Sequence, residues 1–300
     1  MSDMRQQAVS FPSEGVTLKG VLYTPEHSSG RLPGIVVTGT WTSVKEQMAN
    51  RYAQRLAAEG FATLSFDFRG YGESEGQPRD FESPDLKMED IHNAFSFLQT
   101  RSEVNSQQLG ALGICASAGY TLVNTVQDAR VKSLALVAPW LHNGDIVRTL
   151  YSGDAGVAER IHLANAARIK FEQTGTVEYV PAVSQTDKMA AMLFHLDFYM
   201  NKERGAIPQW PNRFAVMAWT GWLTFDPIRF GRNVAVPVQI VHSEAAATPE
   251  GVKEFYTLVK SQKDILWTKG EQTDFYDLEP QVTIAVQAVA KHFDSTLQDK

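Results

Sequence analysis

The sequence predicts an α/β protein whose mostly parallel sheet is covered by helices on both faces. Strand-like and helix-like segments alternate along most of the 300 residues, a pattern typical of this class. A run of small residues at 113–119 joins an apolar segment directly to a helical one, and about a hundred residues separate two of the later strand-like segments. With 43% hydrophobic and 21% charged residues, the chain can bury a large core.

The first half of the chain supplies most of the expected sheet. Residues 16–23 alternate like an early antiparallel strand, and 34–38 are almost all apolar, as in a buried parallel strand. Residues 44–59 have the spacing of an amphipathic helix that Gly60 ends. Further strands are expected at 61–66, 108–114 and 131–138, and further helices at 87–99 and 117–127.

A long insertion interrupts the pattern before the next strand, 238–242, which follows Pro237. An insertion of this length is typical of a lid, so we expect an α/β core at 1–140 and 230–300 and a helical lid at 141–229. The lid should hold helices at 157–173 and 186–199 and an aromatic segment with Trp210, Phe214, Trp219, Trp222 and Phe225. The chain should close with a helix at 249–260, a strand at 264–268 and a helix at 280–293.

Composition argues against several classes of partner. The net charge of −6 and the scattered Lys and Arg residues argue against nucleic acid binding. No run has the 18 or more apolar residues of a membrane span, and the polar start does not resemble a signal peptide. One cysteine excludes an internal disulfide framework, so a cytoplasmic location is expected. No zinc-ligand spacing or phosphate loop indicates a metal or cofactor, and a homodimer is compatible with the sequence.

The run Gly-Ile-Cys-Ala-Ser-Ala-Gly at 113–119 fits a nucleophile elbow in two registers, with either Cys115 or Ser117 as the nucleophile. In such an elbow the nucleophile occupies a strained turn between a strand and a helix. We favour Cys115 because the strand 108–114 ends immediately before it, whereas Ser117 would lie about half a turn into the helix.

Three segments together resemble the α/β-hydrolase superfamily: Val-Val-Thr-Gly-Thr-Trp at 36–41, Phe-Asp-Phe-Arg-Gly-Tyr-Gly-Glu-Ser at 66–74, and the elbow. The chain is most similar to a dienelactone-hydrolase-like bacterial branch, and similar also to fungal hydrolase-fold polyketide acyl transferases. This resemblance implies an eight-stranded sheet, a lid after the sixth strand, and a triad in the order nucleophile, acid, histidine. It also implies oxyanion donors at the Ala116 N–H and at the N–H of Thr40 or Trp41.

Two positions depart from the pattern that the resemblance implies. Ala246 stands where the triad acid is expected, and Gln272 stands where the histidine is expected. A glutamine cannot take up a proton near neutral pH, so the general base cannot come from the expected position.

Two alternatives could activate Cys115 without a histidine at position 272. His242 with Glu244, or His142 with Asp145, follows the carboxyl end of a predicted strand and could serve Cys115. Alternatively no base is needed, because a thiol is a few per cent thiolate at pH 7 and a partly exposed cysteine at a helix N-terminus favours the anion.

The leading hypothesis is hydrolysis or transfer of a small apolar ester, thioester or lactone through Cys115. Substrate contacts are expected from His142, Trp219, Trp222 and Gln272. A lyase or cyclase, or a binding protein without turnover, is the alternative that Ala246 and Gln272 favour.

Overall fold

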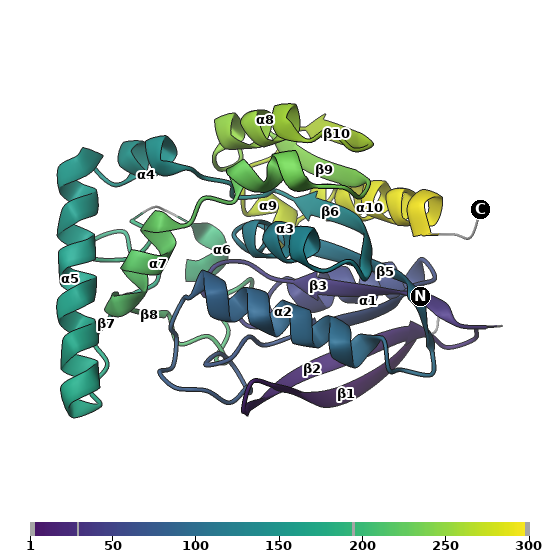
Figure 1. The fold of residues 1–300 in the computed structure, drawn as a ribbon, viewed down its shortest axis with the longest axis horizontal. Coiled ribbons are helices and arrows are strands. Elements are labelled where there is room, and N and C mark those ends of the chain that lie inside the picture. The colour runs from purple at the N-terminus through teal and green to yellow at the C-terminus, as the bar shows by residue number, and fades with distance from the viewer. Residues whose placement is uncertain (1–3, 29, 194–195, 298–300) are drawn as a thin grey trace.

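The computed structural model describes residues 4–28, 30–193 and 196–297 (Figure 1). Within them, eight strands form one sheet in the order β1-β2-β4-β3-β5-β6-β9-β10. The β1–β2 and β2–β4 pairs are antiparallel and the remaining pairs are parallel, which confirms the predicted mostly parallel sheet. The strands are β1 (Met4–Ser13), β2 (Val16–Pro25), β3 (Leu32–Thr38), β4 (Ala62–Phe66), β5 (Val104–Ile114), β6 (Val131–Val137), β9 (Val238–Ser243) and β10 (Lys263–Thr268).

Helices cover both faces of this sheet. On one face α1 (Ala49–Ala58) packs against α10 (Gln281–Leu297), and on the other α2 (Pro84–Leu98) packs against α3 (Ser117–Gln127) (Figure 1). A further helix, α8 (Pro249–Leu258), lies beside β9 and β10 in sequence and follows the loop after β9. Because both faces are covered, residues 34–38 of β3 and all of β4 are buried, and Ile35, Val36 and Val37 of β3 are apolar in succession.

The segment between β6 and β9 lies at the end of the sheet where the parallel strands finish (Figure 1). It contains α4 (Gly144–Leu150), α5 (Gly153–Thr174), α6 (Asp197–Met200) and α7 (Trp219–Thr224), with a small sheet of β7 (Tyr179–Pro181) and β8 (Arg213–Ala215). Active sites of open α/β sheets lie at this edge, so the inserted segment stands over the expected position of the site. That it acts as a separate lid stays a prediction.

The structure corrects several predicted elements. The strand β1 was not expected, and the helix expected at 44–59 begins only at Ala49. The helix expected at 186–199 is wrong: the described part of this segment is irregular up to α6, and 194–195 lie outside the described residues. The Ala191 and Met192 N–H groups donate to the carbonyls of Pro181 and Ala182, at 2.9 and 2.8 Å, so tertiary pairing takes the donors that a helix would use.

None of the helices in the described part of the chain is long and apolar enough to cross a membrane.

Candidate active site

The elbow lies between β5, which ends at Ile114, and α3, which begins at Ser117. Cys115 stands between them with a φ of +56°, a backbone conformation that non-glycine residues rarely adopt. The turn is fixed by its backbone, because the Cys115 N–H donates to the Val137 carbonyl while the Cys115 carbonyl accepts from the Ala118 and Trp140 N–H groups. A Cβ at Gly113 would lie 2.7 Å from the Ala118 Cα, which explains the small residue there.

Ser117, the other candidate, is the first residue of α3 and is fully buried. Its hydroxyl has no hydrogen-bond partner among the described residues. The strained turn therefore lies at Cys115 and the serine lies inside the helix.

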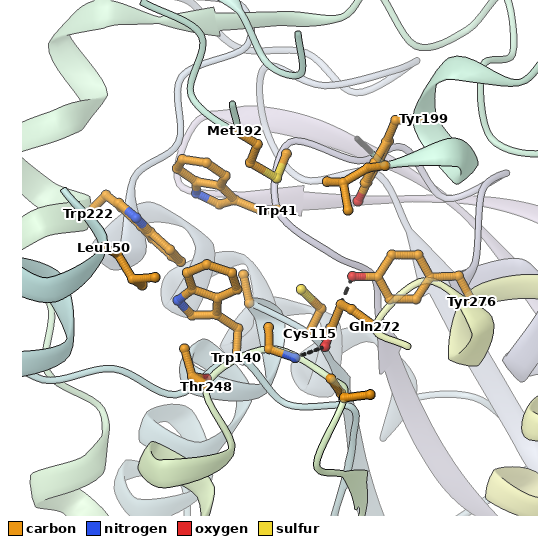
Figure 2. Close-up of a pocket in the computed structure, with 15 residues that line it drawn as sticks. Trp41, Cys115, Trp140, Leu150, Met192, Tyr199, Trp222, Thr248, Gln272 and Tyr276 are labelled. Atoms are coloured by element: carbon orange, nitrogen blue, oxygen red, sulfur yellow. Dashed lines mark hydrogen bonds between the residues drawn. The ribbon is translucent and has the colours of Figure 1, made fainter. Parts of the chain in front are cut away.

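Above Cys115 is a cavity of about 320 Å³ with two different walls (Figure 2). Trp41, Trp140 and Trp222 form an aromatic wall, to which Leu150 and Met192 add apolar surface. The opposite wall carries hydroxyl and amide groups from Tyr199, Tyr276 and Gln272 (Figure 2). Lining residues from the loop after β9 are Ala245, Ala246, Ala247 and Thr248, and Ala116 and Leu196 complete the set.

Burial raises the pKa of the Cys115 thiol, against the expectation of a partly exposed cysteine with a lowered pKa. The residue is 6% exposed. Hydrogen bonds from the Tyr276 hydroxyl, the Ala116 N–H, the Gln272 side chain and the Trp41 N–H oppose this rise in pKa. The two backbone donors belong to the residues at which oxyanion donors were expected, and both approach Sγ.

Thr40, the alternative oxyanion residue, contributes differently. Its side chain is fully buried, and its Oγ1 lies 2.6 Å from the Tyr199 hydroxyl oxygen. Thr40 does not line the cavity, whereas Trp41 does.

The two tryptophans expected in the pocket have different positions. Trp222 lines the cavity and stacks on Trp41 with ring centroids 4.5 Å apart, while its Nε1 donates to the Tyr151 hydroxyl at 3.0 Å. Trp219 is not a lining residue; it packs behind Trp41 and against Phe214, with centroids 6.0 and 4.9 Å away. The aromatic side chains of the inserted segment therefore form a layered wall, in which Trp222 faces the cavity and Trp219 lies behind.

The candidate bases do not line the cavity that holds Cys115. His242 is fully buried and packs edge-on against Trp267 at 5.3 Å, and burial lowers its pKa to about 4. Glu244 points to solvent, with its side chain 63% exposed and paired with Lys253 at 2.6 Å.

His142 lies behind the aromatic wall. Its Nδ1 accepts from the Trp140 Nε1 at 3.0 Å, so the ring proton is on Nε2, which donates to the Trp222 carbonyl at 3.1 Å. Burial lowers the pKa of His142 to about 4, which keeps the ring neutral. Its proposed partner Asp145 instead pairs with Arg148 on the surface. His142 is thus hydrogen-bonded to two tryptophans that line the cavity, and it does not line the cavity itself.

Gln272 occupies the place where the triad histidine is expected. Its Oε1 accepts from the Ala247 N–H at 2.9 Å, and its Nε2 donates to the Ala138 carbonyl at 2.8 Å and to the Tyr276 hydroxyl at 3.1 Å (Figure 2). Ala246, at the position of the expected acid, lines the cavity beside it.

Sequence reasoning missed Tyr276, Tyr199 and Trp140. Tyr276 is in the short helix α9 (Asp274–Asp277), four residues after Gln272, so one helical turn could have placed both side chains together. Tyr199, in α6, and Trp140, after β6, reach the cavity only through tertiary packing.

Outside the cavity, oxygens of Glu46, Asp67 and Glu73 lie within 4.8 Å of one another, a spacing that could suit a metal ion. The Lys45 ammonium occupies this cluster, at 2.7, 2.8 and 2.5 Å from the three carboxylates. The cluster is therefore an ion-pair network with its own cation.

Known proteins match nearly the whole chain. The X-Pro dipeptidyl-peptidase family (S15) matches residues 14–268. The protein PA2218 of Pseudomonas aeruginosa is 32% identical, over 91% of this chain and 76% of its own length. Its crystal structure has a TM-score of 0.88 with 27% identity, covering 99% of this chain and 95% of that one.

Fungal proteins are also similar. Thiohydrolase aneE of Aspergillus aculeatus is 27% identical over 57% of this chain and 53% of its own. The crystal structure of the α/β-hydrolase GrgF from Penicillium has a TM-score of 0.82 at 22% identity, covering 98% of this chain and 99% of that one, which shows a common fold. These matches confirm the resemblance to α/β-hydrolases and to the fungal group. The chain belongs to the X-Pro dipeptidyl-peptidase (S15) family, and it is a hydrolase or acyltransferase of the α/β-hydrolase fold.

Proposed function

We propose that this protein transfers or hydrolyses activated acyl groups through a covalent intermediate on Cys115. The observation that carries the proposal is the position of Sγ: it stands on the strained turn at φ +56°, and the Ala116 and Trp41 N–H groups approach it. A carbonyl carbon attacked by Sγ would place its oxygen among these same donors, which stabilise a developing oxyanion.

A cysteine suits this site better than a serine would. A serine hydroxyl needs a base to attack, whereas a thiol is intrinsically nucleophilic even when mostly protonated. Since Gln272 occupies the position of the base, an uncatalysed hydroxyl at position 115 would be inert, but a thiol can still react with an activated carbonyl.

The cavity selects a neutral, largely apolar acyl group. Its described lining has no Asp, Glu, Lys or Arg side chain, and one wall is formed by three tryptophans. A peptide with a free N-terminal amine would leave an ammonium without a counter-charge there, which is costly. Cleavage of X-Pro dipeptides is therefore not expected of this chain, in spite of its family name.

Relatives support an acyl thioester as the substrate class. One similar protein is named a thiohydrolase and others are named polyketide transferases. A thiolate is a better leaving group than an alkoxide, so a thioester makes the smallest demand on a site without a base. We assign residues 141–229 as a lid that encloses the acyl chain, because α4, α6 and α7 each give the cavity a lining residue.

The experiment is acylation of the purified protein by a series of saturated acyl thioesters, followed by intact-mass analysis. An adduct of the mass of the acyl group is expected on the wild type and on Ser117→Ala, and none on Cys115→Ala. Ser117→Ala is the matched control because it removes a buried hydroxyl two residues away without touching the turn. An adduct that survives in Cys115→Ala but disappears in Ser117→Ala would transfer the nucleophile role to Ser117.

One observation favours a second candidate function, the noncovalent lyase or cyclase. With a buried thiol and a glutamine at the base position, the same N–H donors could hold the oxygen of an enolate without any bond to Sγ. Tight binding of acyl compounds to both the wild type and Cys115→Ala, with no adduct on either, would favour this function over acyl transfer.

A further inference from the structure

The geometry points to the Tyr276 hydroxyl as the catalytic group that moves the proton between Cys115 and the sulfur of a thioester substrate. This inference rests on the proposed function, acyl transfer through Cys115, and assigns the proton step that Gln272 cannot perform. It adds Tyr276 to the reacting groups and favours a thiol over water as the acceptor of the acyl group.

The orientation of the Gln272 amide is fixed by its neighbours. The Ala247 N–H can only donate, so the atom 2.9 Å from it is the amide oxygen. The Ala138 carbonyl can only accept, so the atom 2.8 Å from it is the amide nitrogen. The nitrogen also lies 3.1 Å from the Tyr276 hydroxyl and interacts with the Cys115 thiol, so its second N–H is directed toward these two groups and the Tyr276 oxygen accepts from it.

Tyr276 therefore accepts a hydrogen bond from Gln272 and is left with its own proton to donate. The hydroxyl interacts with the Cys115 thiol and with the Tyr199 hydroxyl, both of which line the same cavity (Figure 2). Tyr199 is already in a 2.6 Å hydrogen bond with Thr40 Oγ1. The Tyr276 hydroxyl can therefore exchange protons with Sγ and with the sulfur of a thioester bound beside it, and the hydrogen bond from Gln272 holds the hydroxyl in the cavity.

Tyr276 is suited to relay a proton between two groups. Its hydroxyl stays protonated, so it releases its proton to one group only when it accepts a proton from the other. Burial raises the pKa of Tyr276 well above its ordinary value, and burial also raises the pKa of Tyr199. Both hydroxyls keep their protons near neutral pH. A buried phenol of this kind can pass on one proton while it takes up another, but it cannot serve as a standing base.

The step balances in both directions. Sγ attacks the thioester carbonyl and forms the new S–C bond, while the Sγ proton moves to the Tyr276 oxygen. The original Tyr276 proton moves to the departing sulfur as the old C–S bond breaks, so the product leaves as a neutral thiol. When an incoming thiol attacks the acyl group on Cys115, its proton returns to Sγ by the same route.

The chemistry of this relay favours thiols over water as acceptors. An ordinary thiol has a pKa of roughly 8.5, whereas that of water is about 15.7. Without a base, the relay can take the proton of an attacking thiol. It is poorly suited to take the proton of an attacking water, which is far less acidic. The geometry thus favours thioester exchange over hydrolysis.

The test compares two variants that each lose one buried tyrosine hydroxyl. Tyr276→Phe removes the proposed relay. Tyr52→Phe is the matched control, because the Tyr52 hydroxyl donates to the Phe275 carbonyl at 2.6 Å and so supports α9 from outside the cavity. For each protein, the rate of acylation by an octanoyl alkyl thioester is divided by the rate of alkylation by iodoacetamide. Alkylation also uses the thiolate but delivers no proton to its leaving group, iodide, so this ratio isolates proton delivery to the departing sulfur from the position and ionisation of Sγ.

Tyr276→Phe should lower this ratio by roughly a hundredfold, the lower end of the range typical of general acid–base catalysis, and Tyr52→Phe should leave it unchanged. The deficit of Tyr276→Phe should shrink with an octanoyl thiophenyl ester, whose more acidic thiol departs without a proton. An unchanged ratio in Tyr276→Phe, or the same deficit with both esters, would overturn the relay.

The experiment distinguishes failure of the proton relay from failure of the proposed function. If the wild type is acylated on Cys115 and Tyr276→Phe behaves like it, only the relay is wrong. If no thioester acylates the wild type, the proposed function falls as well.

Discussion

Substituting Glu82 tests whether a buried ion pair holds the oxyanion loop in place. Glu82 and Lys87 are both fully buried behind the site, with Lys87 Nζ 2.7 Å from the carboxylate. The carboxylate also accepts from the Thr42 N–H at 2.9 Å, the Tyr71 hydroxyl at 3.0 Å and the Tyr120 hydroxyl at 2.8 Å. Thr42 directly follows Trp41, and Tyr120 is on α3, so one carboxylate joins the oxyanion loop to the nucleophile helix.

The loss in the free energy of unfolding depends on which charged group each substitution leaves buried without its partner. Glu82→Gln keeps the shape but leaves the Lys87 ammonium buried and unpaired, which typically costs about 3–5 kcal/mol. Lys87→Met leaves the carboxylate with three neutral donors, so its cost should be smaller, about 1.5–3 kcal/mol for a lost charged hydrogen bond. The double variant should cost less than the sum of the two, because neither charge is then left alone.

The assay is urea unfolding of the four proteins, compared as a double-mutant cycle. Additive effects, or a Glu82→Gln variant as stable as the wild type, would refute the assignment of the pair as a coupled unit. The folded Glu82→Gln protein should also acylate more slowly, by up to about a hundredfold. The reason is that Thr42 has a strained φ of +57°, and losing the carboxylate releases the loop that carries the Trp41 N–H.

Three further outcomes are expected. Gln272→His combined with Ala246→Asp should restore a base and its acid. The double variant should release the acyl group to water at least roughly tenfold faster than the wild type. Equal rates of release would contradict the role given to Gln272. Trp222→Leu should shift the preferred acyl chain to greater length, because Trp222 walls the cavity, and an unchanged chain-length profile would place the acyl group elsewhere. Iodoacetamide should label Cys115 more slowly than a free thiol at pH 7 to 8 and approach the free-thiol rate only as the pH rises. The reason is that burial raises the pKa of the Cys115 thiol and so lowers its thiolate fraction. Rapid labelling at pH 6 would contradict this argument.

The sequence was sufficient for the elbow because its determinants are local. An apolar strand, a run of small residues and a helix start within a few positions define the turn, and Cys115 lies on it at positive φ. The strand β3 was predictable for the same reason, since Ile35, Val36 and Val37 are buried and apolar in succession. The absence of a histidine at position 272 was also visible in the sequence and is the basis of the argument about the missing base.

Only the tertiary structure decided what surrounds the sulfur. Trp41, Tyr199 and Tyr276 come from three distant segments, and Tyr199 joins the other two only because the inserted segment packs over the edge of the sheet. The same packing overrode local helix propensity near Ala191, where backbone donors pair across to Pro181. It also buried the thiol, and because desolvation depends on every neighbouring atom, the direction of the Cys115 pKa shift could not be read from a helix N-terminus alone.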